Sequence, residues 1–176
     1  MNNKNILIIA TGGTIASKQS EEGLLPKMNI NEILSYLPNM AKQYNIAMKD
    51  LFSLDSSNIQ PEEWVEIANS INENYRDFDG IVVTHGTDTM AYTASILTFI
   101  LQNIPIPIVV TGSQLPIGEP LTDAIDNLKL ALTMASTGIA GVFVAFNRKI
   151  MLACRAVKVR TTGFDAFESI NYPNVA

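Results

Sequence analysis

Residues 11–14, Thr-Gly-Gly-Thr, are the stretch of this sequence whose residue types are best suited to chemistry. They follow the apolar run at residues 6–10, which is short and rich in β-branched residues and therefore predicts a buried strand. Two consecutive glycines let the backbone turn sharply and approach a ligand closely. Thr14 would then lie at the carboxyl end of a strand, where backbone N–H groups could hold an oxyanion. Thr14 is a candidate nucleophile, and the alternative is a strand–loop junction that uses glycine only for its turn.

Three further polar segments follow predicted strands. They are residues 55–58 (Asp-Ser-Ser-Asn), 85–89 (His-Gly-Thr-Asp-Thr) and 112–114 (Gly-Ser-Gln), after strands predicted at 46–52, 81–84 and 108–111. Because the carboxyl ends of parallel strands share one edge of a sheet, we expect these segments to converge with Thr14 on a polar site for a small molecule. The sequence contains neither GxxxxGK[ST] nor GxGxxG, so a nucleotide-binding site is disfavoured.

The roles of the other candidate residues depend on where the fold places them. Asp88 could cap the helix predicted from about Met90, or its carboxylate could hold a substrate ammonium group. Thr87 could also cap this helix, or it could position a water molecule or polarise a carbonyl group. Lys158 would be a surface lysine by default, but if it is buried beside Asp88 it could accept a proton. Ser56 closes a turn or hydrogen-bonds a substrate carboxylate.

Some residues are better explained by structure than by chemistry. The single histidine, His85, is expected to be a packed imidazole with one hydrogen bond, and not a general base. The single cysteine, Cys154, is expected to be a small buried hydrophobe. Trp64 is expected to lie in the core. One histidine and one cysteine also exclude a multi-histidine metal site, a CxxC metal site and an internal disulfide within this chain, so no metal is expected.

Composition narrows the class of protein further. A formal net charge of -5 without a basic run argues against binding a nucleic-acid backbone. No run approaches the length of about 18 apolar residues that a membrane span needs, and the N-terminus lacks the pattern of a signal peptide. We therefore expect a cytoplasmic protein without membrane contact. Its 176 residues, 47% of them hydrophobic, predict one ordered domain.

Predicted helices alternate with the predicted strands. The helices are expected at residues 31–37, from Pro61 onward, at 90–101 and at 121–135, with a fifth strand at 141–146 and a hairpin through 147–149 into 150–153. Residues 18–23 lack apolar periodicity and are expected to form a surface loop, or a lid over Thr14. This alternation predicts an α/β fold, a doubly wound, mostly parallel sheet with helices on both faces (a Rossmann- or flavodoxin-like three-layer sandwich).

Several of these segments together resemble a known family. Residues 11–17 and 83–90, the turns at 55–57 and 112–114, and residues 166–172 are similar to motifs of the bacterial-type L-asparaginases, closest to the cytoplasmic type I group. The resemblance covers essentially the whole chain. It implies a doubly wound N-terminal domain, here residues 1–176, and places the family's smaller C-terminal α/β domain outside this chain.

The resemblance also implies an activity and a catalytic set. Family members hydrolyse L-asparagine to L-aspartate and ammonia without a metal or cofactor. By resemblance, Thr14 attacks the side-chain amide carbon to form a β-aspartyl ester, and Thr87, Lys158 and Asp88 form a second catalytic triad. Family enzymes are homo-oligomers, dimers or tetramers, and an isolated N-terminal domain is expected to hydrolyse its substrate slowly or not at all.

Substrate binding is implied in the same way. Ser56 would hold the α-carboxylate of L-asparagine and Asp88 its α-amino group, with Asp55 and Ser57 at the same turn as Ser56. Charged anchors at one end of the substrate would hold its other end against the nucleophile. Residues 23–26, which include Leu24 and Leu25, stand where many family members carry a tyrosine that helps to activate the nucleophile. The group that activates Thr14 is then Lys158 or an equivalent group from elsewhere.

Three alternative functions remain open at this point. The first is the glutaminase-type component of an amidotransferase, which releases ammonia for tRNA-linked glutamine synthesis. The second is a non-catalytic module that binds an amino acid or supports assembly, because the same residues would serve binding and reaction. The third is a nucleotide-binding domain, which predicts affinity for ATP or NAD.

Overall fold

A six-stranded sheet forms the middle layer of the computed structural model, which describes residues 3–20, 23–26 and 28–176 (the backbone alone for 16–20 and 23–26). In spatial order its strands are β4 (Tyr44–Leu54), β1 (Lys4–Gly12), β5 (Gly80–Thr84), β6 (Pro107–Thr111), β7 (Gly141–Phe146) and β8 (Lys149–Leu152). The first five strands run parallel, and β8 pairs antiparallel with β7. The predicted α/β fold with a mostly parallel sheet is confirmed.

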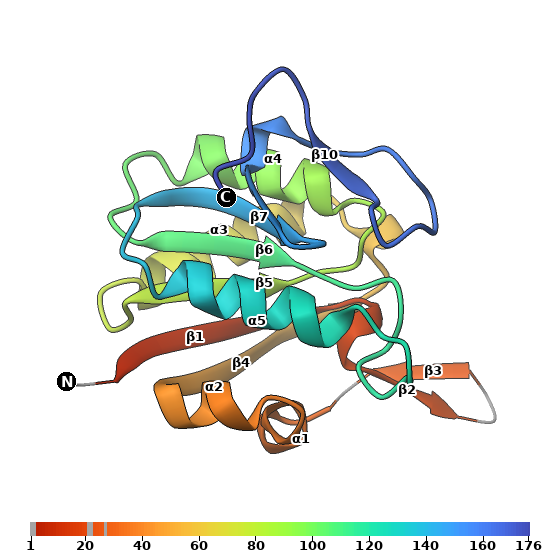
Figure 1. The fold of residues 1–176 in the computed structure, drawn as a ribbon. Coiled ribbons are helices and arrows are strands. Elements are labelled where there is room, and N and C mark those ends of the chain that lie inside the picture. The colour runs from red at the N-terminus through yellow and green to blue at the C-terminus, as the bar shows by residue number, and fades with distance from the viewer. Residues whose placement is uncertain (1–2, 21–22, 27) are drawn as a thin grey trace.

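Helices cover both faces of this sheet (Figure 1). They are α1 (Ile30–Ser35), α2 (Pro38–Gln43), α3 (Pro61–Asn74), α4 (Met90–Ile100) and α5 (Ala124–Ala135). Leu7 and Ile9 of β1 belong to the hydrophobic core that α3 and α4 share, while Ile6 and Ile8 belong to the core on the other face with α1 and α5. Because side chains alternate between the faces of a strand, the continuous apolar run of β1 fills both cores.

Strand order places the polar segments together. The chain runs from β1 to β4 on one side, and then returns past β1 to β5, β6 and β7 on the other. In such a sheet, ligands bind at the carboxyl ends of the strands where the order reverses. The four polar segments follow β1, β4, β5 and β6, which are neighbours, so their expected convergence on one edge is confirmed.

Most predicted helix boundaries hold, with two differences. α3 begins at Pro61 as expected, where the Gln60 N–H donates to the Glu63 carboxylate at 2.6 Å. α5 begins at Ala124 and not at 121, because the Asp123 carboxylate accepts the backbone N–H groups of Gln114 and Leu115 and holds the preceding connection as a turn. A second helix, α2, starts at Pro38, where only a helix end was predicted, since proline suits a first helical position.

The expectation of a loop at residues 18–23 is wrong over its described part. β2 (Ser17–Ser20) and β3 (Gly23–Pro26) form an antiparallel hairpin, in which Ser17 pairs with Pro26. Residues 21 and 22 lie outside the described residues. The hypothesis that this segment forms a lid over Thr14 concerns side chains outside those described and remains a prediction. The same holds for the effect of having Leu24 and Leu25 in place of the family's tyrosine.

The C-terminal part adds two elements that the sequence did not predict. β9 (Ala156–Lys158) pairs antiparallel with β10 (Phe167–Ser169) after the short 3-10 turn η3 (Ala153–Arg155). The hairpin between β7 and β8 is confirmed, with positive φ angles of 47° and 62° at Asn147 and Arg148. Cys154 is exposed, so its predicted burial is wrong, because η3 turns Ala153 inward and leaves the cysteine outside.

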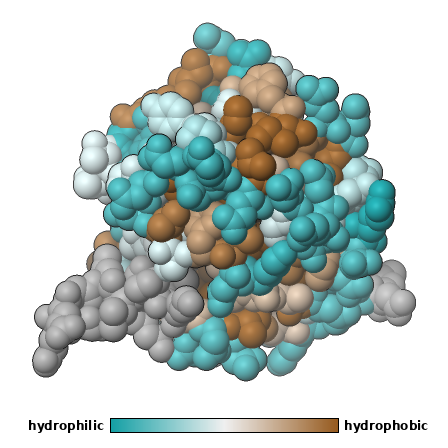
Figure 2. Space-filling model, turned by 180° about the vertical axis from the view of Figure 1, so that it is seen from behind, coloured by the Kyte–Doolittle hydropathy of each residue, from teal (hydrophilic) through white to brown (hydrophobic). Residues whose placement is uncertain are grey.

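Some large apolar side chains remain at the surface. Val65 of α3 and Phe99 and Ile100 of α4 are exposed, and Figure 2 shows brown patches of hydrophobic residues between hydrophilic ones on the face seen from behind. Within the part of the chain that the structure describes, no helix has both the length and the apolar character needed to cross a membrane.

Candidate active site

The turns after β1 and β5 are in direct contact. Gly13 has a φ of 83°, and a Cβ at this position would lie 2.5 Å from the Gly86 nitrogen and 2.8 Å from the His85 carbonyl carbon. Only glycine fits both the left-handed backbone and this close approach. Thr14, the residue after Gly13, is half-buried and begins the 3-10 turn η1 (Thr14–Ala16). The contact therefore brings the segments that carry Thr14 and Thr87 together.

Replacing Gly13 with alanine is expected to reduce the free energy of unfolding by about 2–4 kcal/mol, because the new methyl group strains the backbone and also overlaps Gly86. Urea denaturation measures this loss. Gly138→Ala is the matched control, since Gly138 has a φ of 75° but no atom within 4 Å of the point where a Cβ would lie. The control is expected to lose about 1 kcal/mol, from backbone strain alone. Equal losses in both variants would contradict the contact.

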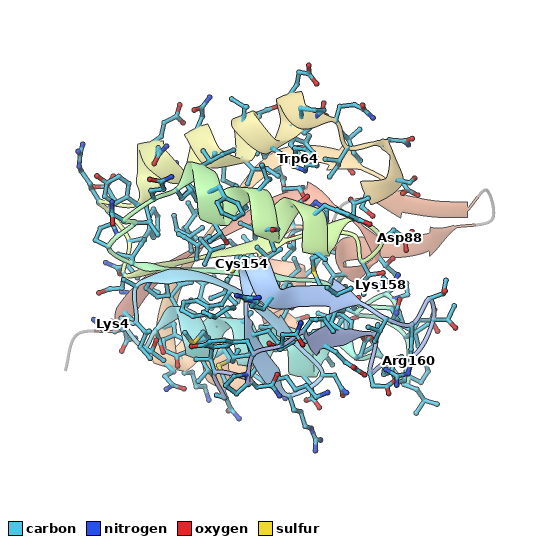
Figure 3. The ribbon with its side chains drawn as sticks, turned by 90° about the horizontal axis from the view of Figure 1, so that it is seen from above. Lys4, Trp64, Asp88, Cys154, Lys158 and Arg160 are labelled. Atoms are coloured by element: carbon cyan, nitrogen blue, oxygen red, sulfur yellow. The ribbon has the colours of Figure 1, made fainter. Side chains whose placement is uncertain are left out.

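Lys158 joins two residues of the turn after β5. Its ammonium nitrogen donates to Thr87 Oγ1 at 2.9 Å and to the Asp88 carboxylate at 2.7 Å. The lysine side chain is 13% exposed, whereas that of Asp88 is 63% exposed. Figure 3 shows Lys158 and Asp88 pointing toward one another, on the side of the molecule opposite Lys4. The interpretation of Lys158 as a plain surface lysine is therefore wrong.

The pairing with Lys158 also rules out one of the two interpretations of Asp88. Thr89, and not Asp88, occupies the cap position of α4, and it makes no side-chain cap hydrogen bond there. The Thr89 hydroxyl donates instead to the Ser56 carbonyl oxygen at 2.7 Å. The capping interpretation of Asp88 is wrong, because its carboxylate is directed to the ammonium group of Lys158.

Gln114 belongs to the predicted polar segment 112–114, but the sequence assigned it no role of its own. The Thr87 hydroxyl donates to Gln114 Oε1 at 3.3 Å. The Gln114 amide nitrogen donates in turn to the carbonyl oxygens of Thr161 and Gly163, at 3.3 and 3.1 Å. A polar residue directly after a predicted strand was the signal that could have found it. Gln114 ties Thr87 to the segment between β9 and β10.

The turn after β4 supplies the remaining candidates. The Asp55 carboxylate accepts the Ser57 hydroxyl at 2.7 Å and the Ser57 N–H at 2.9 Å, and these two hydrogen bonds lower the pKa of Asp55. Asp55 thus caps the short 3-10 turn η2 (Ser56–Asn58). Ser56 is buried, and its hydroxyl oxygen would lie 2.6 Å from a Cβ on Gly86. Among these three residues, Ser56 lies against the turn that carries Thr87.

His85 is fully buried behind this turn. Its Nδ1 lies 2.7 Å from the Gly86 carbonyl oxygen and its Nε2 lies 2.9 Å from Thr93 Oγ1. The imidazole therefore makes two hydrogen bonds, where one was expected, and the expectation that it is packed is confirmed. Burial lowers the pKa of His85 to about 4, against a smaller opposing effect of the Gly86 carbonyl.

The lowered pKa of His85 predicts a loss of stability in acid. The unfolded chain takes up this proton at a pKa near 6.5, whereas the folded protein does so only near pH 4. The neutral His85 therefore makes its full contribution to the free energy of unfolding above pH 6.5. This contribution, about 3 kcal/mol in total, is lost as the pH falls toward 4.

Urea denaturation of the wild type and of His85→Gln across this pH range isolates the contribution of the histidine from that of the carboxylates. The difference between the two proteins is expected to shrink as the pH falls. A difference that stays constant with pH would contradict the burial of a neutral imidazole.

The side chains brought together at this edge of the sheet limit what the site can do chemically. Among the residues that the structure describes, no group of three or more His, Cys, Asp or Glu side chains is placed to hold a metal ion. What the site offers is a half-buried threonine beside a hydrogen-bonded set of a second threonine, an ammonium group and a carboxylate. Such a set can hold a polar substrate and move protons.

Comparison with known proteins gives consistent matches. The family model described as "Asparaginase, N-terminal" matches residues 5–176. The chain is 49% identical to the L-asparaginase of Thermococcus kodakarensis over 97% of its own length and 52% of the relative. It is 40% identical to L-asparaginase 1 of Escherichia coli, over 98% of the chain and 53% of the relative. The chain thus spans about half the length of these curated relatives.

A second group of relatives carries a different name. A glutamyl-tRNA(Gln) amidotransferase component of Pyrococcus abyssi is 38% identical over 94% of the chain and 40% of the relative. Among solved structures, the thermostable L-asparaginase of Thermococcus kodakarensis superimposes with a TM-score of 0.89 at 47% identity, covering 97% of this chain and 52% of that one. The probable cytoplasmic L-asparaginase of Campylobacter jejuni gives a TM-score of 0.88 at 31% identity, over 98% and 55% of the two chains.

Proposed function

Because the chain belongs to the asparaginase family, we propose that its site hydrolyses L-asparagine to L-aspartate and ammonia, with Thr14 as the nucleophile. The contact of Lys158 with both Thr87 and Asp88, beside the turn that carries Thr14, is the observation that supports this proposal most directly. The names of the relatives at 49% and 40% identity point to the same substrate.

The reaction proceeds in two steps. Thr14 Oγ attacks the side-chain amide carbon, and its proton passes by way of Thr87 and Lys158 to the amide nitrogen. The carbon–nitrogen bond then breaks and ammonia departs. A water molecule then attacks the resulting β-aspartyl ester, which releases L-aspartate and restores the threonine. In the second step, one proton of the water molecule returns to Thr14 by way of the same two residues, Thr87 and Lys158, which are hydrogen-bonded to each other.

Substrate binding is proposed at the charged and hydroxyl groups beside this set. Ser56 holds the α-carboxylate of L-asparagine, with Asp55 and Ser57 shaping its turn. Asp88, whose carboxylate is largely exposed although it is paired with Lys158, holds the α-amino group. Anchoring this end of the molecule presents the side-chain amide to Thr14. We also propose that the protein is a homo-oligomer and that it is cytoplasmic. The name of the Campylobacter jejuni relative supports the cytoplasmic location.

The test is an assay of both products from L-asparagine. Purified protein is expected to release ammonia and L-aspartate in equal amounts and at a low rate, and to release ammonia still more slowly from L-glutamine. Faster release from L-glutamine would favour the amidotransferase-related function that the Pyrococcus abyssi relative suggests. Calorimetric binding of L-aspartate without any ammonia release would favour a binding module, and the absence of both would overturn the proposal.

A further inference from the structure

The peptide that joins His85 to Gly86 is the point where the turns of the site meet. A Cβ on Gly13 would lie 2.5 Å from the Gly86 nitrogen, and a Cβ on Gly112 would lie 2.3 Å from the His85 carbonyl oxygen. On a third side, the Ser56 hydroxyl oxygen would lie 2.6 Å from a Cβ on Gly86. This one peptide therefore sets the spacing between the turns that follow β1, β4 and β6.

A chain of hydrogen bonds leads from the next peptide, which joins Gly86 to Thr87, to two helices. The imidazole of His85 lies between the Gly86 carbonyl oxygen and the hydroxyl of Thr93 in α4. The same hydroxyl oxygen accepts the indole N–H of Trp64 in α3 at 2.9 Å. Trp64, Thr93 and His85, which we call the relay, thus connect α3 and α4 to the meeting point of the turns.

The two ends of the relay determine the direction of every hydrogen bond in it. An indole N–H can only donate, and a backbone carbonyl oxygen can only accept. Since Thr93 Oγ1 accepts from Trp64, its own proton is available for His85 Nε2, which then acts as the acceptor. The proton of the neutral ring must consequently lie on Nδ1, which donates to the Gly86 carbonyl oxygen. With the proton on Nε2 instead, two lone pairs would face each other at 2.7 Å.

We propose that the relay holds His85 in the neutral tautomer protonated at Nδ1, and that this tautomer fixes the Gly86 carbonyl group and so positions Thr87 for the reaction. The effect on turnover rests on the proposed function, whereas the tautomer does not. The three relay residues are positioning residues, because they act on Thr87 through the backbone of Gly86. Trp64, expected to serve only as core, is half-buried and supplies the first donor.

The tautomer can be read directly, because His85 is the only histidine of the chain. A long-range proton–nitrogen correlation spectrum of untagged, 15N-labelled protein at pH 7 will contain the signals of one imidazole. We expect a protonated Nδ1 and an unprotonated Nε2. A protonated Nε2, or rapid exchange between the two tautomers, would overturn the proposal whether or not the protein hydrolyses L-asparagine.

Variants of Thr93 test the positioning role. Thr93→Val removes the hydroxyl at nearly constant shape, and is expected to lower kcat for L-asparagine about tenfold while KM stays within about twofold, because Thr87 shifts relative to the bound substrate. Thr93→Ser restores the hydroxyl and is expected to restore kcat to within about twofold. Trp64→Phe removes only the first donor, and is expected to give a smaller loss together with partial tautomer exchange.

Thr98→Val is the matched control, since Thr98 lies on the same helix and its hydroxyl donates only to the Ala94 carbonyl oxygen, at 3.0 Å. It is expected to leave kcat and the nitrogen spectrum unchanged. Equal losses of kcat in Thr93→Val and Thr98→Val would mean that any loss of a hydroxyl on α4 lowers kcat, and would overturn the positioning role of the relay. A wild type with the expected tautomer but no ammonia release would overturn the proposed function alone.

Discussion

Thr14→Ala is expected to lower ammonia release from L-asparagine by on the order of 10⁴-fold, the largest loss among the variants considered, because it removes the nucleophile itself. The alanine leaves the turn at Gly13 and its contact with Gly86 in place, so L-aspartate should still bind by calorimetry. Thr14→Ser retains a hydroxyl group and is expected to retain measurable turnover.

Trapping the intermediate strengthens this test. Hydroxylamine attacks the β-aspartyl ester in place of water, so the wild type is expected to form β-aspartyl hydroxamate and Thr14→Ala to form none. Thr133→Ala serves as the control, because the hydroxyl of Thr133 is exposed and donates only to the Lys129 carbonyl oxygen within α5. Turnover or hydroxamate formation that survives in Thr14→Ala would reject Thr14 as the nucleophile.

Lys158→Met is expected to lower kcat by about 10²–10³-fold, because methionine fills a similar volume but cannot exchange a proton with Thr87. The Asp88 carboxylate also loses its partner at 2.7 Å, so KM is expected to change as well. Steady-state kinetics with L-asparagine separates the two effects. Circular dichroism checks that the variant keeps the secondary structure of the wild type.

Lys4→Met is the matched control for this variant. Lys4 also forms an ion pair, with Asp79 at 2.8 Å, and this pair lies on the side of the molecule opposite Lys158 (Figure 3). Its side chains are 51% and 35% exposed, so its loss is expected to change stability by less than about 1 kcal/mol and to leave kcat unchanged. If Lys158→Met behaved like this control, Lys158 would be a partner of Asp88 without a catalytic role.

Local sequence was sufficient to predict the sheet and the edge that carries the polar turns. Short apolar runs predict buried parallel strands, and the helix start at Pro61 follows from proline and two glutamates at the first helical positions. The pairing of β2 with β3 escaped prediction because the two strands have four residues each and their sequences do not alternate between apolar and polar residues. Cys154 was placed inside because its burial depends on how η3 turns, which composition does not reveal.

The residues of each turn were likewise visible in the sequence, but their partners were not. Lys158 is separated from Thr87 by 71 positions. It reaches the site because β9, a strand of three residues that pairs with β10, packs against α4. The same kind of contact brings Gln114 to Thr87 and turns Asp88 from a possible cap into the partner of Lys158.

Sequence by itself therefore determined the α/β class, the order of the strands' polar ends and the residues present at each of them. The tertiary structure alone decided which side chains touch. The physical reason is that periodicity and turn chemistry are properties of neighbouring residues, whereas a hydrogen bond between distant side chains depends on how whole elements pack. His85 illustrates both: its place after a strand and its contact with the Gly86 carbonyl oxygen are local, but its hydrogen bond to Thr93 needs α4 beside it.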